Sequence, residues 1–226
     1  MDGYRLSAAR RELLRSLAAE IAAAAGEGPS LVAVDGVDGA GKTVFADQLA
    51  AELEAGLAGT GRTVVRASAD DFHHPRAVRY RRGRQSPDGF WLDSYDYPRM
   101  RAELLDPLRA GRGRFRTAAH DLNSDLPVDE PARPVLAGTV LVLDGIFLHR
   151  DELLGYWTYS VFLDVPFAVS ATRMAARDGT PADPDDPALA RYVGGQLRYL
   201  AACRPRQRAT AVIDHADLDA PRRIAR

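Results

Sequence analysis

The chain has 226 residues and a formal net charge of −1, and this length suits one α/β domain with a sizeable core. A nearly neutral chain is not a general nucleic-acid binder, because such proteins are usually strongly basic. No apolar run approaches the roughly 20 residues that span a membrane. The single cysteine, Cys203, cannot form an internal disulfide, which favours a reducing cytoplasmic location.

Residues 1–26 predict an amphipathic N-terminal helix. Arginines and glutamates interrupt its Ala- and Leu-rich sequence, which excludes a secretory signal. The apolar positions that follow a helical period are Leu6, Leu13, Leu14, Leu17 and Ile21.

Strands and helices alternate along the rest of the chain. The expected strands cover residues 30–35, 63–67, 140–144, 160–165 and 209–213. The expected helices cover residues 43–57, 98–110, 167–177 and 188–202. Residues 111–134 predict a short hairpin with loops, and a proline-rich loop follows the third of these helices. This order predicts a single α/β domain, residues 1–226, with a mostly parallel sheet, helices on both faces and a small lid at about 177–188.

Residues 36–43, Gly-Val-Asp-Gly-Ala-Gly-Lys-Thr, match the phosphate-binding pattern G-x-x-x-x-G-K-[ST] in full. Glycines let the backbone turn its N–H groups toward phosphates, and the following helix points its positive end at them. We expect Lys42, the only lysine among 30 basic residues, to reach the phosphates of ATP, and Thr43 to coordinate Mg²⁺. The expected nucleotide ligands in this loop are Gly36, Asp38, Gly39, Ala40, Gly41, Lys42 and Thr43. Whether the donor is ATP or another nucleoside triphosphate stays open.

Acidic residues follow two of the predicted strands. Asp144 ends the most hydrophobic strand, where an acid beside a phosphate loop would hold Mg²⁺ through water. Asp70 and Asp71 follow the strand at 63–67, where a carboxylate would orient an acceptor hydroxyl and accept its proton. The alternative for each is a loop-initiating acid. We therefore expect Asp70, Lys42 and Asp144 to be the catalytic residues.

Arginines supply the remaining candidates. The stretch from Arg76 to Arg84 is either a solvated face or a flap over anionic groups, and Arg82 is its candidate acceptor contact. Arg173 and Arg177 lie four residues apart just before the lid and are expected to close over the triphosphate. The neighbouring pair His73 and His74 favours packing over metal binding.

From about Ser30 to Ile213 the chain resembles the uridine kinase and phosphoribulokinase group of P-loop kinases. Four passages carry the resemblance: residues 36–43, 68–72, 93–97 and 143–146. The resemblance implies a P-loop NTPase fold, with Asp70 as catalytic base and Asp96 holding ribose hydroxyls beside Tyr95. It places Arg173 and Arg177 in the helix that leads into the lid.

The chain also departs from this family. Asp144 stands where the family often has glutamate. His120 and Leu122 fall where uridine kinases carry a tyrosine and a phenylalanine beside the base, so the two aromatics that would bind uracil are missing. Pantothenate kinases carry passages similar to residues 70–72 and 94–96. Phosphoryl transfer is therefore better supported than uridine as the acceptor.

The sequence thus favours an ATP- and Mg²⁺-dependent kinase of a small-molecule hydroxyl, with uridine or cytidine as the first acceptor. The alternatives are another small alcohol, such as pantothenate or a sugar phosphate, or a non-catalytic ATP-binding regulator. A Ras-type GTPase is excluded, because its N-K-x-D motif needs a lysine and Lys42 is already in the phosphate loop. The expected partner is the acceptor, with no nucleic acid and no membrane; a homo-oligomer remains open.

Overall fold

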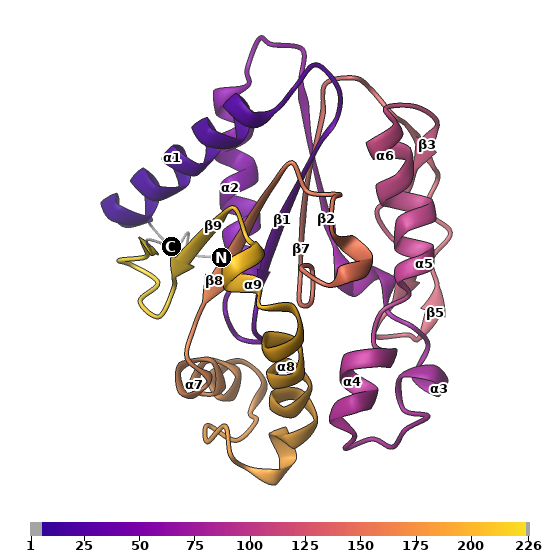
Figure 1. Ribbon diagram of the computed structural model, residues 1–226, viewed down its shortest axis with the longest axis vertical. Coiled ribbons are helices and arrows are strands. Elements are labelled where there is room, and N and C mark those ends of the chain that lie inside the picture. Colours follow the sequence, from indigo (N-terminus) through magenta and orange to yellow (C-terminus); the bar gives the residue numbers. More distant parts are fainter. Residues whose placement is uncertain (1–5, 225–226) are drawn as a thin grey trace.

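The computed structural model describes residues 6–224 and is built around one six-stranded sheet. The strand order is β10-β9-β8-β1-β7-β2, and every neighbouring pair is parallel except the edge pair β9 and β10 (Figure 1). The strands are β1 (Ser30–Gly36), β2 (Thr63–Ser68), β7 (Thr139–Gly145), β8 (Tyr159–Asp164), β9 (Ala211–Asp214) and β10 (Arg222–Ile224). The predicted mostly parallel sheet is confirmed.

Helices cover both faces of the sheet, because alternate side chains of its central strands enter two different cores. Val32 and Val34 pack with α1 (Ala8–Ala24) and α2 (Lys42–Gly56), which lie together on one face (Figure 1). Leu31 and Ala33 pack on the other face. The helices there include α5 (Tyr97–Met100), α6 (Asp106–Ala110) and α8 (Ala190–Cys203). A sheet buried on both faces accounts for the continuous apolar runs of β1 and β7.

The helix expected at 98–110 contains a wider turn. A π-helical turn, Arg101–Leu105, separates α5 from α6. Pro107 follows that turn at the start of α6. In a regular α-helix its ring would clash with the carbonyl of residue 103, and a wider turn relieves that clash.

Residues 69–93 hold short elements that the sequence pattern did not specify, whereas residues 111–134 hold the hairpin structure that it predicted. The first segment contains a 3₁₀ turn (Ala69–Phe72), α3 (Arg76–Arg79) and α4 (Pro87–Asp93). The second contains two nested antiparallel pairs, β3 (Arg114–Phe115) with β6 (Arg133–Pro134) and β4 (His120–Asp121) with β5 (Leu126–Pro127).

The chain reaches the sheet again through β8, then passes through α7 (Phe167–Asp178) and a proline-rich loop into α8. Two further 3₁₀ turns, Asp151–Leu153 and Pro187–Leu189, and α9 (Pro205–Arg208) complete the described elements. No helix within residues 6–224 is both long and apolar enough to cross a membrane.

Strand register brings the predicted site residues to one edge of the sheet. Asp144 of β7 is paired with Val34 of β1 and with Ser68 of β2. The phosphate loop therefore leaves β1 beside Asp144, and the 3₁₀ turn that carries Asp70 leaves β2 on the other side of it. In open α/β sheets, ligands bind outside the carboxyl ends of such strands.

Candidate active site

The loop at residues 36–43 wraps tightly between β1 and α2. Gly39 and Gly41 have φ angles of 70° and 85°, a left-handed conformation that glycine adopts without strain. A Cβ atom on Gly39 would lie only 2.6 Å from the carbonyl oxygen of Ser170, so the loop packs closely against α7. The Lys42 ammonium donates to the Val37 carbonyl over 2.9 Å and so lies across the loop. This arrangement gives phosphates both backbone N–H groups and a positive charge.

Thr43 and Asp144 form a hydrogen-bonded pair beside this loop. The Thr43 hydroxyl donates to Oδ2 of Asp144 over 2.8 Å, and Arg66 Nη2 lies 2.8 Å from Oδ1. Asp144 is only 2% exposed, and Arg66 compensates its buried charge. Mg²⁺ prefers oxygen ligands and usually keeps several waters beside one or two protein oxygens. The pair fits Mg²⁺ on Thr43 with Asp144 acting through water, and that role stays a prediction.

Asp70 lies in the 3₁₀ turn after β2, with its carboxylate largely exposed and held in place. The Tyr95 hydroxyl donates to Oδ1 of Asp70 over 2.9 Å. The Asp70 carbonyl accepts from Nδ1 of His73 over 2.9 Å. Burial, followed by the charge of Asp70, raises the pKa of Tyr95 well above its ordinary value, so its hydroxyl remains a donor. The result is an oriented carboxylate with a free face at the carboxyl edge of the sheet.

Asp71 stands next to this carboxylate and is partly withdrawn from solvent. Burial raises the pKa of Asp71 to about 6, and the charges of Asp70 and Asp144 add to the effect. The adjacent carboxylates of Asp70 and Asp71 thus concentrate negative charge in the turn after β2.

The predicted acceptor residues Asp96, Tyr95 and His120 lie around the same turn. Asp96 caps α5 by accepting from the backbone N–H of Arg99 over 3.0 Å, and its Oδ2 lies 3.8 Å from Nδ1 of His74. His120 is 3% exposed, and its Nε2 lies 3.3 Å from Oδ1 of Asp125. Neither ring nitrogen of His120 has a hydrogen-bond partner within residues 6–224. A buried imidazole in this state is suited to a polar ligand.

The two arginines of α7 have different surroundings. Arg173 donates from Nη2 to the carbonyls of His215 and Ala216, over 2.9 and 2.8 Å, and so ties α7 to the loop after β9. Arg177 is exposed and paired with Asp178 at 2.7 Å. That hydrogen bond raises the pKa of Arg177, with smaller contributions from the charges of Asp38 and Asp70. Nη1 of Arg173 also lies 3.4 Å from the Gly39 carbonyl, so Arg173 contacts the phosphate loop, whereas Arg177 lies exposed with its charge paired to Asp178.

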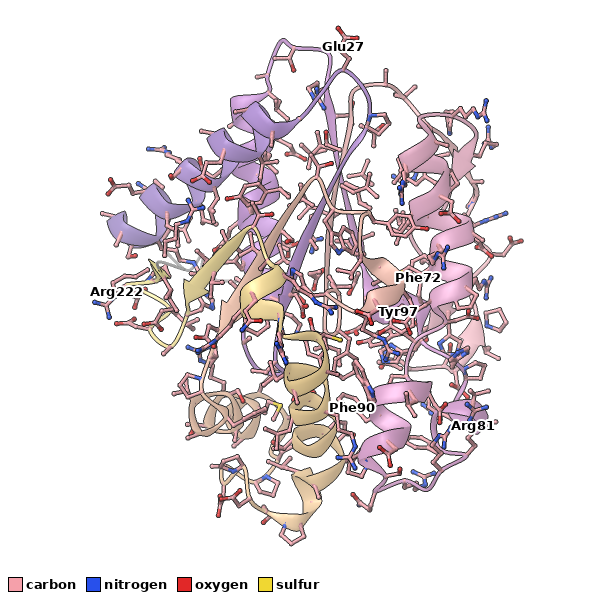
Figure 2. The ribbon with its side chains drawn as sticks, in the orientation of Figure 1. Glu27, Phe72, Arg81, Phe90, Tyr97 and Arg222 are labelled. Atoms are coloured by element: carbon pink, nitrogen blue, oxygen red, sulfur yellow. The ribbon has the colours of Figure 1, made fainter. Side chains whose placement is uncertain are left out.

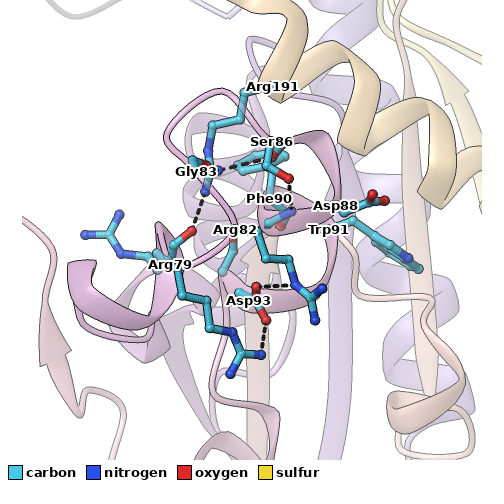
Figure 3. A network of polar contacts seen from close by, with 12 residues as sticks. Arg79, Arg82, Gly83, Ser86, Asp88, Phe90, Trp91, Asp93 and Arg191 are labelled. Carbon is cyan, nitrogen blue, oxygen red and sulfur yellow. Dashed lines mark hydrogen bonds and ion pairs between the residues drawn. The ribbon is translucent and has the colours of Figure 1, made fainter.

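Arg82 lies apart from these residues. Its Nε is 2.8 Å from Oδ2 of Asp93 (Figure 3). Arg81 pairs with the other oxygen of the same carboxylate. Asp93 is 1% exposed, so both arginines neutralise a buried acid. Arg82 thus has a structural partner in Asp93, and its contact with the acceptor stays a prediction.

Gln196 of α8 holds the one acidic residue of the phosphate loop, a contact that the sequence did not indicate. Its Oε1 accepts from the backbone N–H of Asp38 over 2.7 Å, and its Nε2 donates to Oδ2 of Asp38 over 3.2 Å. Gln196 is 2% exposed. Burial raises the pKa of Asp38, the charge of Lys42 lowers it and that of Asp70 raises it. The charges of Lys42 and Asp70 thus act on the pKa of Asp38 in opposite directions.

A buried polar cluster lies behind the loop and was also missed. Asp35 accepts from Nδ1 of His149 over 2.7 Å and from the hydroxyl of Tyr199. Its other oxygen accepts from the backbone N–H of Gly36 over 2.7 Å. These three side chains lie far apart in the sequence, so no local spacing could reveal them. The cluster anchors the first residue of the phosphate loop to the segment after β7, through His149, and to α8, through Tyr199.

The fold and these residues define an α/β protein with a glycine-rich loop of the phosphate-binding pattern and an oriented carboxylate beside it. No protein-family model and no curated protein matches the chain. Solved structures of other proteins do match it. A protein described as a possible uridine kinase from Bacillus stearothermophilus has 23% identity and a TM-score of 0.66, covering 90% of this chain and 98% of its own.

Two other solved structures have the same fold. A candidate fructose transport system kinase from Silicibacter has 24% identity and a TM-score of 0.68, covering 88% of this chain and 98% of its own. D-glycerate 3-kinase from Cryptococcus neoformans has 12% identity and a TM-score of 0.55, covering 95% and 97%. The chain therefore has the P-loop fold of uridine kinase-like kinases, as its sequence resemblance implied.

Proposed function

We propose that this protein is a small-molecule kinase that transfers the γ-phosphoryl group of ATP to a hydroxyl group. A nucleoside such as uridine or cytidine is the first candidate acceptor. The observation that carries the proposal is the Asp70 carboxylate, fixed by Tyr95 at 2.9 Å and presented at the same sheet edge as the phosphate loop. The similar solved structures are described as kinases, which supports the same reaction class.

In this reaction Asp70 accepts the proton of the acceptor hydroxyl, while the oxygen of that hydroxyl bonds to the γ-phosphorus. The bond from that phosphorus to the bridging oxygen breaks, and ADP leaves. Lys42 and the loop N–H groups hold the phosphates, and Arg177 adds positive charge from the lid side. Mg²⁺, when bound at Thr43, neutralises charge shared by the β- and γ-phosphates.

The test is ADP release from Mg-ATP with a panel of acceptors: uridine, cytidine, pantothenate, nicotinamide riboside and ribulose 5-phosphate. Stimulation by uridine or cytidine supports the nucleoside assignment. Stimulation by another member keeps the reaction and moves the acceptor. Tight ATP binding without stimulation by any member contradicts the proposal and favours a non-catalytic regulator.

A further inference from the structure

The arginine stretch at residues 76–84 is the obvious place to look for recognition of an anionic acceptor, yet its charges already have partners. Arg76 donates to the Asn123 carbonyl over 2.9 Å. Arg81 and Arg82 share Asp93, as Figure 3 shows for Arg82. The Arg84 guanidinium lies 5.0 Å from the centre of the Tyr80 ring.

Arg79 is the buried member of this stretch and is countered as well. Its Nη2 lies 3.4 Å from Oδ1 of Asp125. The same carboxylate lies 3.3 Å from Nε2 of His120, so it stands between Arg79 and the acceptor side of the site. Arg191 of α8, nearby in Figure 3, donates to the carbonyls of Arg79 and Ser86 over 3.0 and 3.1 Å. These bonds tie the stretch to α8 and orient the Arg191 guanidinium toward backbone carbonyls.

The groups around the reacting carboxylate are mainly acidic. Asp70 and Asp71 are adjacent, and Asp96 lies beside His74 on the next segment. The charges of Asp70, Asp144, Glu130 and Asp121 all help to raise the pKa of Asp71. A second anion brought here by the acceptor would meet this field, and Arg177, the exposed arginine of α7, is already paired with Asp178.

Asp38 adds one more carboxylate from the phosphate loop itself. Gln196 holds its Oδ2 and its backbone N–H, which draws the side chain toward α8. No hydrogen bond to its Oδ1 is present within residues 6–224. This oxygen is therefore an open acceptor on the phosphate loop, and a hydroxyl hydrogen is the group that suits it.

We propose that the acceptor is a polyol without an anionic group, and that Asp38 is the residue that rejects acceptors carrying a phosphate or carboxylate. The inference rests on the proposed function, because it assumes that Asp70 receives the reacting hydroxyl. Asp38 accepts from a second hydroxyl of the same acceptor and repels a negative substituent. The carboxylate of Asp96 also repels a negative substituent on the acceptor.

Matched acceptor pairs test this inference. Each pair shares its reacting hydroxyl and differs in one anionic group: uridine and orotidine, pantothenol and pantothenate, glycerol and glycerate, ribulose and ribulose 5-phosphate. In every pair that stimulates ADP release, the uncharged member is expected to have a kcat/KM at least about ten-fold higher. Preference for the anionic member overturns the inference and leaves the kinase proposal standing. No stimulation by any member contradicts the kinase proposal, and the inference falls with it.

Asp38→Asn identifies the residue responsible. Asparagine keeps an oxygen that can accept from Nε2 of Gln196, and it removes the negative charge. The ratio of kcat/KM between the uncharged and the anionic acceptor of each pair is therefore expected to fall by about ten-fold. Glu27→Gln is the matched control: it removes one charge at the opposite end of the sheet, where Figure 2 labels Glu27, and should leave the preference unchanged. An unchanged preference in Asp38→Asn overturns the role of Asp38.

A measurement on the unaltered protein covers the case in which Asp38→Asn does not fold. Salt screens the repulsion from the exposed carboxylate of Asp70, which adds to that of Asp38. Raising NaCl from about 0.05 to about 0.5 M is therefore expected to narrow the difference in kcat/KM within each acceptor pair for the wild-type protein. A difference that does not respond to salt contradicts a contribution from the exposed carboxylates of the site.

Discussion

Gly145→Ala tests whether the position of Asp70 sets the rate. Gly145 ends β7, and a Cβ atom placed on it would lie 2.4 Å from the Cβ atom of Ala69, the residue before Asp70. Ordinary van der Waals contact begins near 3.4 Å, so the turn that carries Asp70 must move by about 1 Å. A displacement of that size at a reacting group costs about a hundred-fold in rate.

The same substitution overpacks a buried contact, since Ala69 is 1% exposed. The expected destabilisation is about 1–3 kcal/mol, and for a chain of this size the melting temperature should fall by about 2–12 °C. The assays are kcat with the best acceptor, the Kd for Mg-ATP and a melting curve. Gly28→Ala, where a Cβ would meet nothing within 4 Å, is the control. Unchanged kcat in folded Gly145→Ala would refute the reasoning.

Three further predictions follow from contacts of the site. The pKa of Asp71 is about 6 in the folded protein against an ordinary 3.8, so the folded state binds more protons between these values and stability falls as pH rises from about 4 to about 6. Asp71→Asn should therefore raise the melting temperature more at pH 8 than at pH 4, and an equal gain at both would contradict this. Tyr95→Phe removes the donor to Asp70 and should lower kcat about ten-fold or more without changing the Kd for Mg-ATP, measured by calorimetry. Arg82→Ala should lower the melting temperature more than Arg84→Ala, because Arg82 pairs with buried Asp93 whereas Arg84 lies over the ring of Tyr80. Equal effects on the melting temperature would argue against a stabilising role of the Arg82–Asp93 pair.

The sequence predicted the sheet and the phosphate loop because both leave local patterns. β1 and β7 are continuous apolar runs ending at the loop and at Asp144, and parallel pairing then brings those ends together. The helix pattern after the loop was equally clear, and α2 begins at Lys42, one residue before the expected start.

The missed features depend on tertiary contacts. The short helix α4 contains Pro87 and Gly89, and these residues do not predict a helix. The helix is stabilised by packing, because Phe90 is buried against Gly195 of α8. A Cβ atom on Gly195 would lie 2.8 Å from Cδ1 of Phe90. β10 pairs at the sheet edge with every residue exposed, so it has no apolar pattern. The hydrogen bond from the backbone N–H of Asp38 to Gln196 joins residues from distant segments, and only the folded chain brings them together.

The most direct test of the central claim is Asp70→Asn. Asparagine keeps the size of the side chain and removes its ability to take the hydroxyl proton. General-base catalysis contributes about 10²–10⁴-fold, so we expect kcat to fall by that factor while the Kd for Mg-ATP, measured by calorimetry, stays within about two-fold. Turnover close to that of the wild-type protein, with any acceptor that the wild type uses, would contradict Asp70 as the catalytic base.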